Sequence, residues 1–196
     1  MPAAVIVDYD PAWPIRAGEL LAEVRTAFAP LPGADRFAYE HIGSTAIPGL
    51  AAKPIVDLQV RMPTLPDLAV LAELLAPTRF VPAHGARPDS PGVYRDNPRP
   101  GDDADPERYR KRLFRDSGSA ILHIRRTDSP FAAFVVDFRD WLRCHPEHAG
   151  RYERIKRALA ERHAGDPDYD DYTRAKTAFL DEIQPELRAW VRRGRS

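Results

Sequence analysis

Hydrophobic residues recur at helical spacing at both ends of this chain, whereas the middle alternates between apolar and polar positions. In the stretch 11–29, Ala17, Leu21, Val24 and Phe28 fall on one face of a helix. The run 36–42 alternates with a period of two, which is typical of a half-buried strand. The same analysis predicts further helices at 65–76, 128–144, 147–163 and 169–193, and further strands at 55–60, 80–83, 109–115 and 120–125.

Two segments between these elements show no periodicity. Residues 116–119, with the sequence Asp-Ser-Gly-Ser, are predicted to form a hairpin turn. Residues 85–107 are rich in proline, glycine and acids, so we expect a long surface excursion. The order of a helix, mixed strands and a helical tail predicts an α+β fold. We expect a core over 1–127 with a mixed β-sheet, and a helical segment over 128–196 packed on that core as one domain.

The composition is that of a globular protein with no dominant charge. The chain has 196 residues, of which 43% are hydrophobic and 30% charged, enough apolar material for a packed core. Lysine plus arginine and aspartate plus glutamate number 29 each, so the formal net charge is zero. A neutral chain offers no broad attraction to nucleic acid or to an anionic membrane. Any binding site for an anion must therefore be local.

Three features predict a soluble, cytoplasmic protein. Asp8 and Asp10 come too early for a secretory signal. The longest apolar run, 131–136, is far shorter than a membrane span. The single cysteine, Cys144, rules out a disulfide within the chain, which fits a reducing compartment.

The stretch 40–60, EHIGSTAIPGLAAKPIVDLQV, carries the candidate chemistry. A strand ends in Gly43-Ser44, and a second strand presents Asp57 and Gln59 two positions apart. A Gly-Ser turn exposes backbone N–H groups to a phosphate, and the hydroxyl of Ser44 adds a donor. Acidic groups at i and i+2 of a strand share one face, where they can chelate Mg²⁺. This order resembles the phosphate loop and metal strand of a nucleotidyltransferase, with an uncharged amide at the second acidic position.

His123 is the candidate for a third group in this site. A neutral imidazole is a poor ligand for Mg²⁺ and a better one for Zn²⁺ or Mn²⁺, and it can serve as a general base near neutral pH. We predict Mg²⁺ or Mn²⁺ at Asp57, Gln59 and His123, with His123 as base or as extra ligand. A transition-metal site of His41, Asp57 and His123, which would suit Zn²⁺, is a less favoured alternative. The structural alternatives are a hydrogen-bonded core histidine and a salt bridge between Asp57 and Lys53.

Other basic and aromatic residues are candidates for holding the phosphates of a ligand. Lys111 and Arg115 share one face of a predicted strand, and Arg112 points to the other. Lys111 and Arg115 are predicted to neutralise a leaving pyrophosphate; the alternative is a charged strand edge that faces solvent. Tyr172 and Lys176 lie four residues apart and share a helix face that could reach over the site. The alternative is an exposed helix face.

Thr45 and Lys53, within the loop after Gly43, complete the predicted ligand-binding set. The remaining basic residues of the helical tail, among them Lys156, Arg157 and those in 188–195, are interpreted as solvated charge. The three tryptophans are predicted to be packing anchors: Trp13, Trp141 and Trp190.

Longer stretches of the chain resemble one known family. The most specific is HIGSTAIPGLAAKPIVDLQV at 41–60, preceded by VDYDPAWP near the start of the chain. The runs RLFRD and ILHIRRTDSPF follow in the middle, and FRDWLRCHPEHAGRYERIKRALAERH and YTRAKTAFLDEI in the tail. Together these motifs resemble the GrpB-like family over most of the chain.

The resemblance implies a nucleotidyltransferase-like fold and a transferase role inferred by similarity. Within it, Gly43, Ser44 and Asp57 match the family and the wider superfamily, Gln59 departs from the superfamily's second carboxylate, and His123 matches the family's histidine. Members are also similar to the accessory domain fused to some bacterial dephospho-coenzyme A kinases. Two functions are therefore expected. One is a nucleoside triphosphate-binding protein that transfers a nucleotidyl group, and the other is a non-catalytic module for a phosphate ligand or a partner protein.

Overall fold

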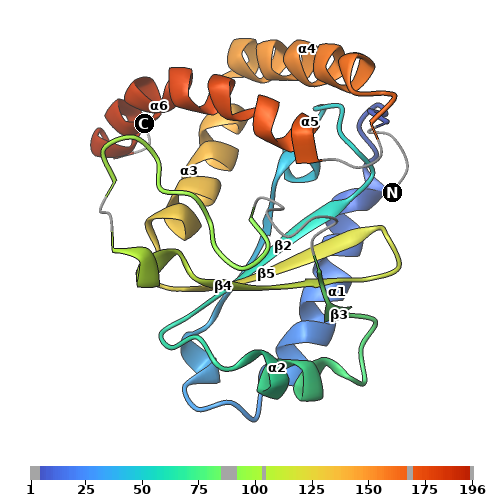
Figure 1. Cartoon of the computed structure of the whole chain (residues 1–196), viewed down its shortest axis with the longest axis vertical. Helices are drawn as coiled ribbons and strands as arrows, with labels where there is room; N and C mark the ends of the chain where they lie inside the picture. The colour runs from blue at the N-terminus through green and yellow to red at the C-terminus, as the bar shows by residue number, and fades with distance from the viewer. Residues whose placement is uncertain (1–4, 85–91, 103–104, 167–169, 195–196) are drawn as a thin grey trace.

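A five-stranded mixed sheet runs through the middle of the computed structural model, which describes residues 5–84, 92–102, 105–166 and 170–194 (Figure 1). The strand order is β1-β2-β5-β4-β3. Strands β2 and β5 are parallel, and the other three neighbouring pairs are antiparallel. Each strand lies within one of the predicted runs or extends it by up to two residues: β1 (Ala38–Ile42), β2 (Val56–Met62), β3 (Val81–Pro82), β4 (Lys111–Arg115) and β5 (Ala120–Arg126).

Helices cover both faces of this sheet. In Figure 1, α1 and α2 lie on one side of it, and α3 to α6 lie over the other, so the helical tail forms a layer of its own. The predicted α+β class is therefore confirmed. The helices are α1 (Ala12–Phe28), α2 (Leu68–Leu75), α3 (Pro130–Cys144), α4 (Pro146–Arg162), α5 (Asp170–Ala175) and α6 (Thr177–Arg192).

Local signals in the sequence account for several boundaries. The hydroxyl of Ser129 caps α3 by accepting the N–H of Ala132, and Pro130 follows as the first helical residue. The predicted turn at 116–119 is present, and the carboxylate of Asp116 accepts three backbone N–H groups within and just after it. The single helix predicted over 169–193 is wrong at Lys176, which separates α5 from α6.

The prediction of a surface excursion over 85–107 is wrong for the residues that fold back onto the sheet. Asp96 is 3% exposed and Arg99 is 6% exposed. The carboxylate of Asp96 pairs with Lys111 of β4 and Arg125 of β5, so charge pairing buries a segment whose composition is polar. Residues 85–91 and 103–104 of this segment lie outside the described residues.

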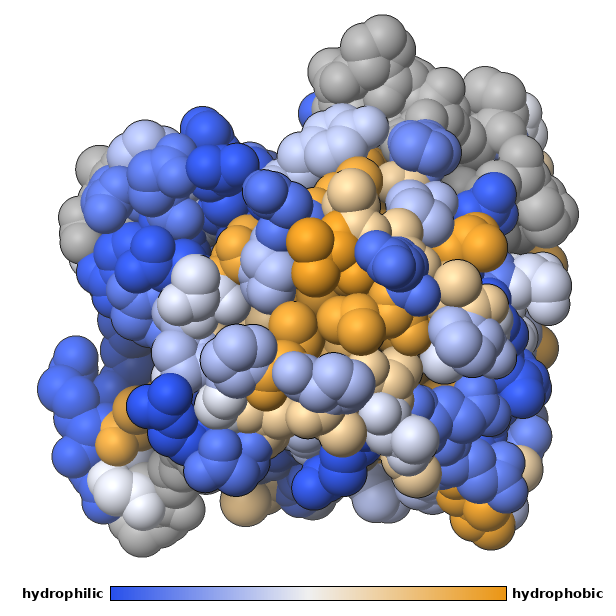
Figure 2. All heavy atoms as spheres, turned by 90° about the horizontal axis from the view of Figure 1, so that it is seen from below, coloured by the Kyte–Doolittle hydropathy of each residue, from blue (hydrophilic) through white to orange (hydrophobic). Residues whose placement is uncertain are grey.

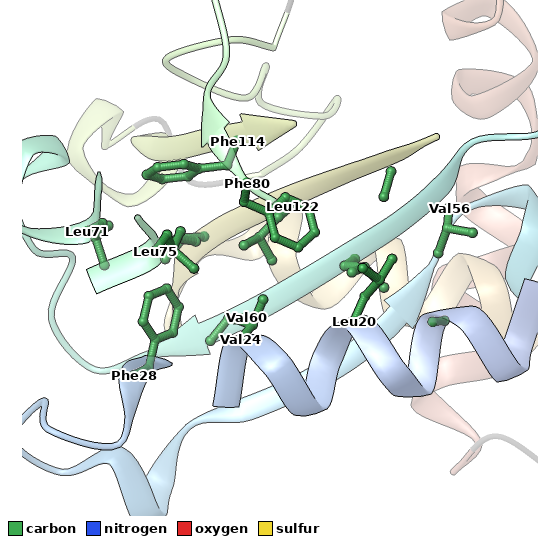
Figure 3. Close-up of a cluster of buried hydrophobic side chains, with 14 of the residues drawn as sticks. Leu20, Val24, Phe28, Val56, Val60, Leu71, Leu75, Phe80, Phe114 and Leu122 are labelled. Atoms are coloured by element: carbon green, nitrogen blue, oxygen red, sulfur yellow. The ribbon is translucent and has the colours of Figure 1, made fainter. Parts of the chain in front are cut away.

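The main hydrophobic core lies between α1, α2 and the sheet. In Figure 3, Leu20, Val24 and Phe28 of α1 point towards Val56 and Val60 of β2. Alternate residues of β2 therefore face this core, and the residues between them face the helical tail. The other core side chains around them are Leu71, Leu75, Phe80, Phe114 and Leu122.

A second core ties the helical tail to the loop between β1 and β2. Ile47 and Leu50 of that loop pack in one cluster with Trp141 of α3, Tyr152 of α4 and Phe179 of α6. The loop that carries the Gly-Ser turn thus packs against side chains of α3, α4 and α6 that come ninety or more residues later in the chain. The tryptophans predicted as packing anchors are confirmed as buried: Trp13, Trp141 and Trp190.

An apolar area lies on the outer surface near α2. Figure 2 shows apolar side chains gathered on the face below α2, ringed by polar groups, and Val70 of α2 is 44% exposed. Among the residues that the structure describes, no helix is long and apolar enough to cross a membrane.

Candidate functional site

Gly43 and Asp57 meet where β1 ends and β2 begins. Ile42 pairs with Asp57 across these strands, so the next residue, Gly43, passes directly over the carboxylate. Gly43 has a φ of 71°, and a Cβ there would lie 2.4 Å from Asp57 Oδ2. Only glycine allows the loop backbone to lie this close to the acid. The structure therefore brings together the bend and the aspartate that the motif singled out.

The hydroxyls after Gly43 have different surroundings. The side chain of Ser44 is half-buried and hydrogen-bonds to the phenol of Tyr152 in α4. Thr45 is 1% exposed, and its hydroxyl lies 3.0 Å from His41 Nε2 and 3.5 Å from the carbonyl oxygen of Ile55. Ser44 can therefore reach a ligand, whereas Thr45 holds the loop to the strands. The prediction of Thr45 as a ligand-binding side chain does not fit this geometry.

Asp57 is the carboxylate at the open end of the polar face of the sheet. Its side chain is 32% exposed, and its Oδ1 lies 3.6 Å from His123 Nε2. Burial by itself raises the pKa of Asp57, but the hydrogen bond from His123 and the charges of Lys53 and Lys176 hold it below its ordinary value. Asp57 is therefore an anion at neutral pH, and cations face it from the loop and from the end of α5.

His123 is held as a neutral imidazole with its proton towards Asp57. Lys111 Nζ and Arg125 Nη2 each lie 3.3 Å from His123 Nδ1. Lysine and arginine only donate hydrogen bonds, so Nδ1 must accept and the proton sits on Nε2. Burial and then the charges of Lys111 and Arg125 lower the pKa of His123 to about 4, although Asp57 acts against them. The role of general base does not fit, because the lone pair faces two fixed cations.

Gln59 is completely buried and fully engaged. Its Oε1 accepts a hydrogen bond of 2.8 Å from Arg125 Nη1. Its Nε2 donates to Glu40 Oε2 at 2.8 Å and to the carbonyl oxygen of Ala132 at 3.1 Å. The amide oxygen expected to coordinate a metal is thus already bound to a guanidinium. Glu40 is in turn paired with Arg61, which completes the network at this end of β2.

The two basic residues predicted on β4 do not reach an open site together. Lys111 is 3% exposed, and its Nζ donates to Asp96 Oδ1 at 2.8 Å. Arg115, four residues on, is exposed and lies at the far end of the strand, opposite Ile121. The expectation that Lys111 and Arg115 jointly neutralise pyrophosphate is therefore not supported. Arg112 points to the other face, as predicted, and donates to the carbonyl oxygen of Pro66.

Tyr172 and Lys176 do come over the site from the helical tail. The ammonium of Lys176 lies 4.8 Å from the centroid of the Tyr172 ring, and that of Lys53 lies 5.1 Å from the same centroid. Burial and then the charge of Lys53 lower the pKa of Lys176 to about 8, while Asp57 raises it. Two ammonium groups from distant parts of the chain thus share one aromatic ring beside Asp57.

The residue that sequence reasoning missed is Lys156. It was interpreted as solvated charge, which is wrong, since it is 2% exposed. Its Nζ donates to the carbonyl oxygen of Ala51 and lies 4.9 Å from the Tyr152 ring centroid. Burial and then the charge of Lys176 lower the pKa of Lys156 to about 7. Helical periodicity placed this residue correctly on α4 but did not show which neighbours would cover it.

One signal in the sequence could have identified it. The chain contains only four lysines against 25 arginines, and all four lie in this region. Lys53, Lys111 and Lys176 are each close enough to Asp57 for its charge to raise their pKa, and Lys156 lies next to Lys176. We call these four residues the lysine cluster.

The side chains around Asp57 do not form a suitable set of ligands for a divalent cation. The amide oxygen of Gln59 is bound to Arg125, and His123 turns an N–H towards Asp57, so Asp57 alone offers a free anionic oxygen. The alternative histidine site also fails, because His41 Nε2 faces Thr45. Within the described parts of the chain, no three His, Cys, Asp or Glu side chains are grouped to hold a metal ion.

A separate cavity lies near the other face of β2. It has a volume of about 410 Å³ and is lined by Trp13 and Arg16 of α1 together with Pro54, Val56 and Ser119. Since Val56 points away from the side on which Asp57 lies, this cavity is not part of the site described above.

Comparison with known proteins gives consistent results over almost the whole chain. A family model described as "GrpB protein" matches residues 3–186. A UPF0157 protein of Pseudomonas aeruginosa is 34% identical over 185 residues, which cover 91% of this chain and 65% of that protein. A dephospho-CoA kinase of Mycolicibacterium paratuberculosis is 30% identical over 199 residues, which cover 94% of this chain and 46% of that protein. The chain thus spans less than two thirds of the length of these two relatives.

Solved structures agree with the fold. The crystal structure of the conserved protein GrpB from Enterococcus faecalis aligns with a TM-score of 0.68 and 24% identity, and covers 93% of this chain and 96% of that one. Weaker matches include a cytoplasmic RNA terminal U-transferase, with a TM-score of 0.43. This distant similarity to nucleotidyltransferases identifies neither a ligand nor a reaction.

Proposed function

Because the chain belongs to the GrpB family, we propose that it binds a small phosphate ligand, a nucleoside triphosphate or a related polyphosphate, between Gly43-Ser44, Asp57 and the lysine cluster. The observation that carries this proposal is the convergence of three of the chain's four lysines on the carboxylate of Asp57, with the fourth next to Lys176. An excess of buried ammonium groups is costly unless an anion accompanies them.

The balance of charges around Asp57 favours an anionic ligand. Lys53 and Lys176 both lie close enough to Asp57 for their charges to lower its pKa. Lys111 shares the single carboxylate of Asp96 with Arg125. Among the described residues, this half of the site therefore holds two cations on one carboxylate. A phosphate group carries the charge and the acceptor oxygens that would balance them.

The use of lysine in an arginine-rich chain fits the same ligand. An ammonium is a compact point charge with three rotatable donors, whereas a guanidinium needs a planar partner. Several ammonium groups can therefore converge on different oxygens of one phosphate. Ser44 adds a half-buried hydroxyl in the same loop, and Gly43 allows the loop backbone to lie against Asp57.

We favour binding over nucleotidyl transfer for this chain. Transfer needs a group that stabilises the leaving pyrophosphate and one that accepts a proton. Lys111, predicted to neutralise the pyrophosphate with Arg115, is paired with Asp96, and His123, predicted as the base, faces Lys111 and Arg125. A phosphate-binding accessory module is consistent with the dephospho-CoA kinase relative, of whose length this chain spans less than half. With a single cysteine in the chain, we expect this role in the reducing cytoplasm.

Selective labelling of lysine tests the proposal directly. Protein grown with [¹³Cε]lysine should give four side-chain signals, one for each residue of the lysine cluster. We expect ATP, pyrophosphate or dephospho-coenzyme A to shift the signals of Lys53 and Lys176 and to raise the melting temperature by mass action. Adenosine, which lacks phosphate, is the control ligand.

Matched variants assign the effect to the site. Lys53→Met and Lys176→Met should each abolish the rise in melting temperature with pyrophosphate. Arg79→Met, which removes half of an exposed ion pair with Glu23, should keep it. Lysine signals that stay unmoved by millimolar concentrations of every phosphate tested would overturn the proposal and favour a module that binds a partner protein.

A further inference from the structure

Arg125 occupies the place at which the sequence motif predicts a metal ion. It is 1% exposed and lies on the same face of β5 as His123. Its Nη1 donates to Gln59 Oε1 at 2.8 Å, and its Nη2 lies 3.3 Å from His123 Nδ1. Two of the three expected metal ligands therefore direct their lone pairs at one guanidinium.

This guanidinium is fixed from its other side by Asp96. Arg125 Nε donates to Asp96 Oδ2 at 2.7 Å, and Nη2 donates to Asp96 Oδ1 at 3.0 Å. Lys111 Nζ reaches the same Oδ1 at 2.8 Å and lies 3.3 Å from His123 Nδ1. The planar fork of arginine suits this bidentate contact, and arginine keeps its charge at any physiological pH.

The local charge opposes a second, mobile cation. Arg125 and Lys111 supply two positive charges against the one carboxylate of Asp96, and their hydrogen bonds to that carboxylate hold both cations in place. A divalent ion at Asp57 would also meet the ammonium groups of Lys53 and Lys176. At these short separations in a partly buried site, repulsion between like charges is strong.

We propose that Arg125 and Lys111 are resident counter-ions that replace the divalent cation, so that this site binds its phosphate ligand without Mg²⁺ or Mn²⁺. The part that concerns the ligand rests on the proposed function. The part that concerns the metal does not, because it follows from the contacts of Arg125 and Lys111. Asp96 is then a positioning residue, since it holds both cations in place and touches no ligand.

Two measurements on the full-length wild-type chain test the two parts separately. In electron paramagnetic resonance without any ligand, the protein should leave the signal of free Mn²⁺ unchanged. In thermal unfolding, the rise in melting temperature with pyrophosphate should be at least as large in EDTA as in Mg²⁺. Retention of Mn²⁺ that disappears in Asp57→Asn, or a pyrophosphate effect that requires Mg²⁺, would overturn the inference.

Substitution of Arg125 should make the binding of pyrophosphate depend on a metal ion. Arg125→Gln frees the amide oxygen of Gln59 and removes one of the two charges beside His123, so we expect pyrophosphate to bind about tenfold more weakly in EDTA and to recover part of that loss with Mn²⁺. If this variant fails to fold, Lys111→Gln should act in the same direction. Arg112→Gln, on the opposite face of β4, is the control and should behave as wild type.

The outcomes also separate this inference from the proposed function. If pyrophosphate has no effect in EDTA or in Mg²⁺, the proposed function fails, and the Mn²⁺ measurement alone decides the part that concerns the metal. If pyrophosphate binds only with Mg²⁺, the proposed function stands and the resident counter-ions are rejected. An unchanged response of both Arg125→Gln and Lys111→Gln to EDTA would likewise reject them.

Discussion

The two faces of β2 differ in chemistry along the whole length of the strand. One face carries Val56, Leu58, Val60 and Met62, each at most 1% exposed and packed under α1 and α2. The other face carries Asp57, Gln59 and Arg61 beneath the helical tail. A single strand of seven residues thus separates a hydrocarbon core from a layer of charge.

This difference shows which face of β2 stabilises the fold and which face contains buried charges that stabilise it little. Burying hydrocarbon stabilises the chain by roughly 25 cal/mol per Å² without any directional requirement. Buried charges contribute little unless every partner is in place, and the loss of one partner is expensive. Charges at the Arg61 end of the polar face are paired, whereas Lys53 and Lys176 both lie near the carboxylate of Asp57 at the other end. Titratable groups whose pKa values are shifted cluster at functional sites, which is the basis of the proposal above.

The largest expected effect comes from breaking the charged layer. Asp96→Asn leaves Lys111 and Arg125 buried without a carboxylate, so we expect a loss of about 3–5 kcal/mol in the free energy of unfolding. Urea denaturation measures it. Asp67→Asn, whose side chain is 91% exposed and 3.8 Å from Arg112, is the control and should change stability by less than about 0.5 kcal/mol. A small loss in Asp96→Asn would mean that the polar layer is not tightly coupled.

The apolar face should respond nearly as strongly to a cavity. Leu58 is fully buried, and Leu58→Ala is expected to cost about 3 kcal/mol, from lost burial and from the empty space left behind. The same denaturation experiment measures it. Val70→Ala, at a position that is 44% exposed, should cost less than about 0.5 kcal/mol. Equal losses at the two positions would contradict the assignment of the core to this face of β2.

A third substitution probes the boundary between the loop and the carboxylate. Gly43→Ala places a methyl group 2.4 Å from Asp57 Oδ2 and must displace the acid. Gly49→Ala also has a positive φ, of 77°, but meets no atom within 4 Å. We therefore expect Gly43→Ala to cost about 1–2 kcal/mol more than Gly49→Ala. Pyrophosphate binding should be lost only in Gly43→Ala; its loss in both variants would show that backbone strain, and not contact with Asp57, is responsible.

The last prediction concerns the dependence of stability on pH. Burial lowers the pKa of both His41 and His123 from 6.5 to about 4. Between these values the unfolded chain binds more protons than the folded chain, so stability should fall as the pH drops from 6.5 towards 4. Thermal unfolding across this range measures the slope, and His123→Gln should make it shallower. A slope that stays unchanged would show that His123 is protonated in the folded protein.

Much of the fold was predictable because its signals are local. The alternation in 55–60 gave the two faces of β2, and the helical spacing over 128–144 gave α3. Gly43 and Asp57 lie at the ends of adjacent strands, so their meeting follows from the pairing of β1 with β2. The roles of Gln59, Thr45 and Lys111 were not predictable, because each depends on a hydrogen-bond partner elsewhere in the chain.

The sequence by itself determined which side of each strand a residue occupies and that a bend precedes an aspartate, since both follow from the geometry of consecutive residues. Only the tertiary structure decided which charged side chains lie close to these residues. Asp96 comes from a segment with no periodicity, and Lys156 and Lys176 come from helices far along the chain. The physical reason is that electrostatic partners are chosen by distance in space, and no spacing along the chain encodes that distance.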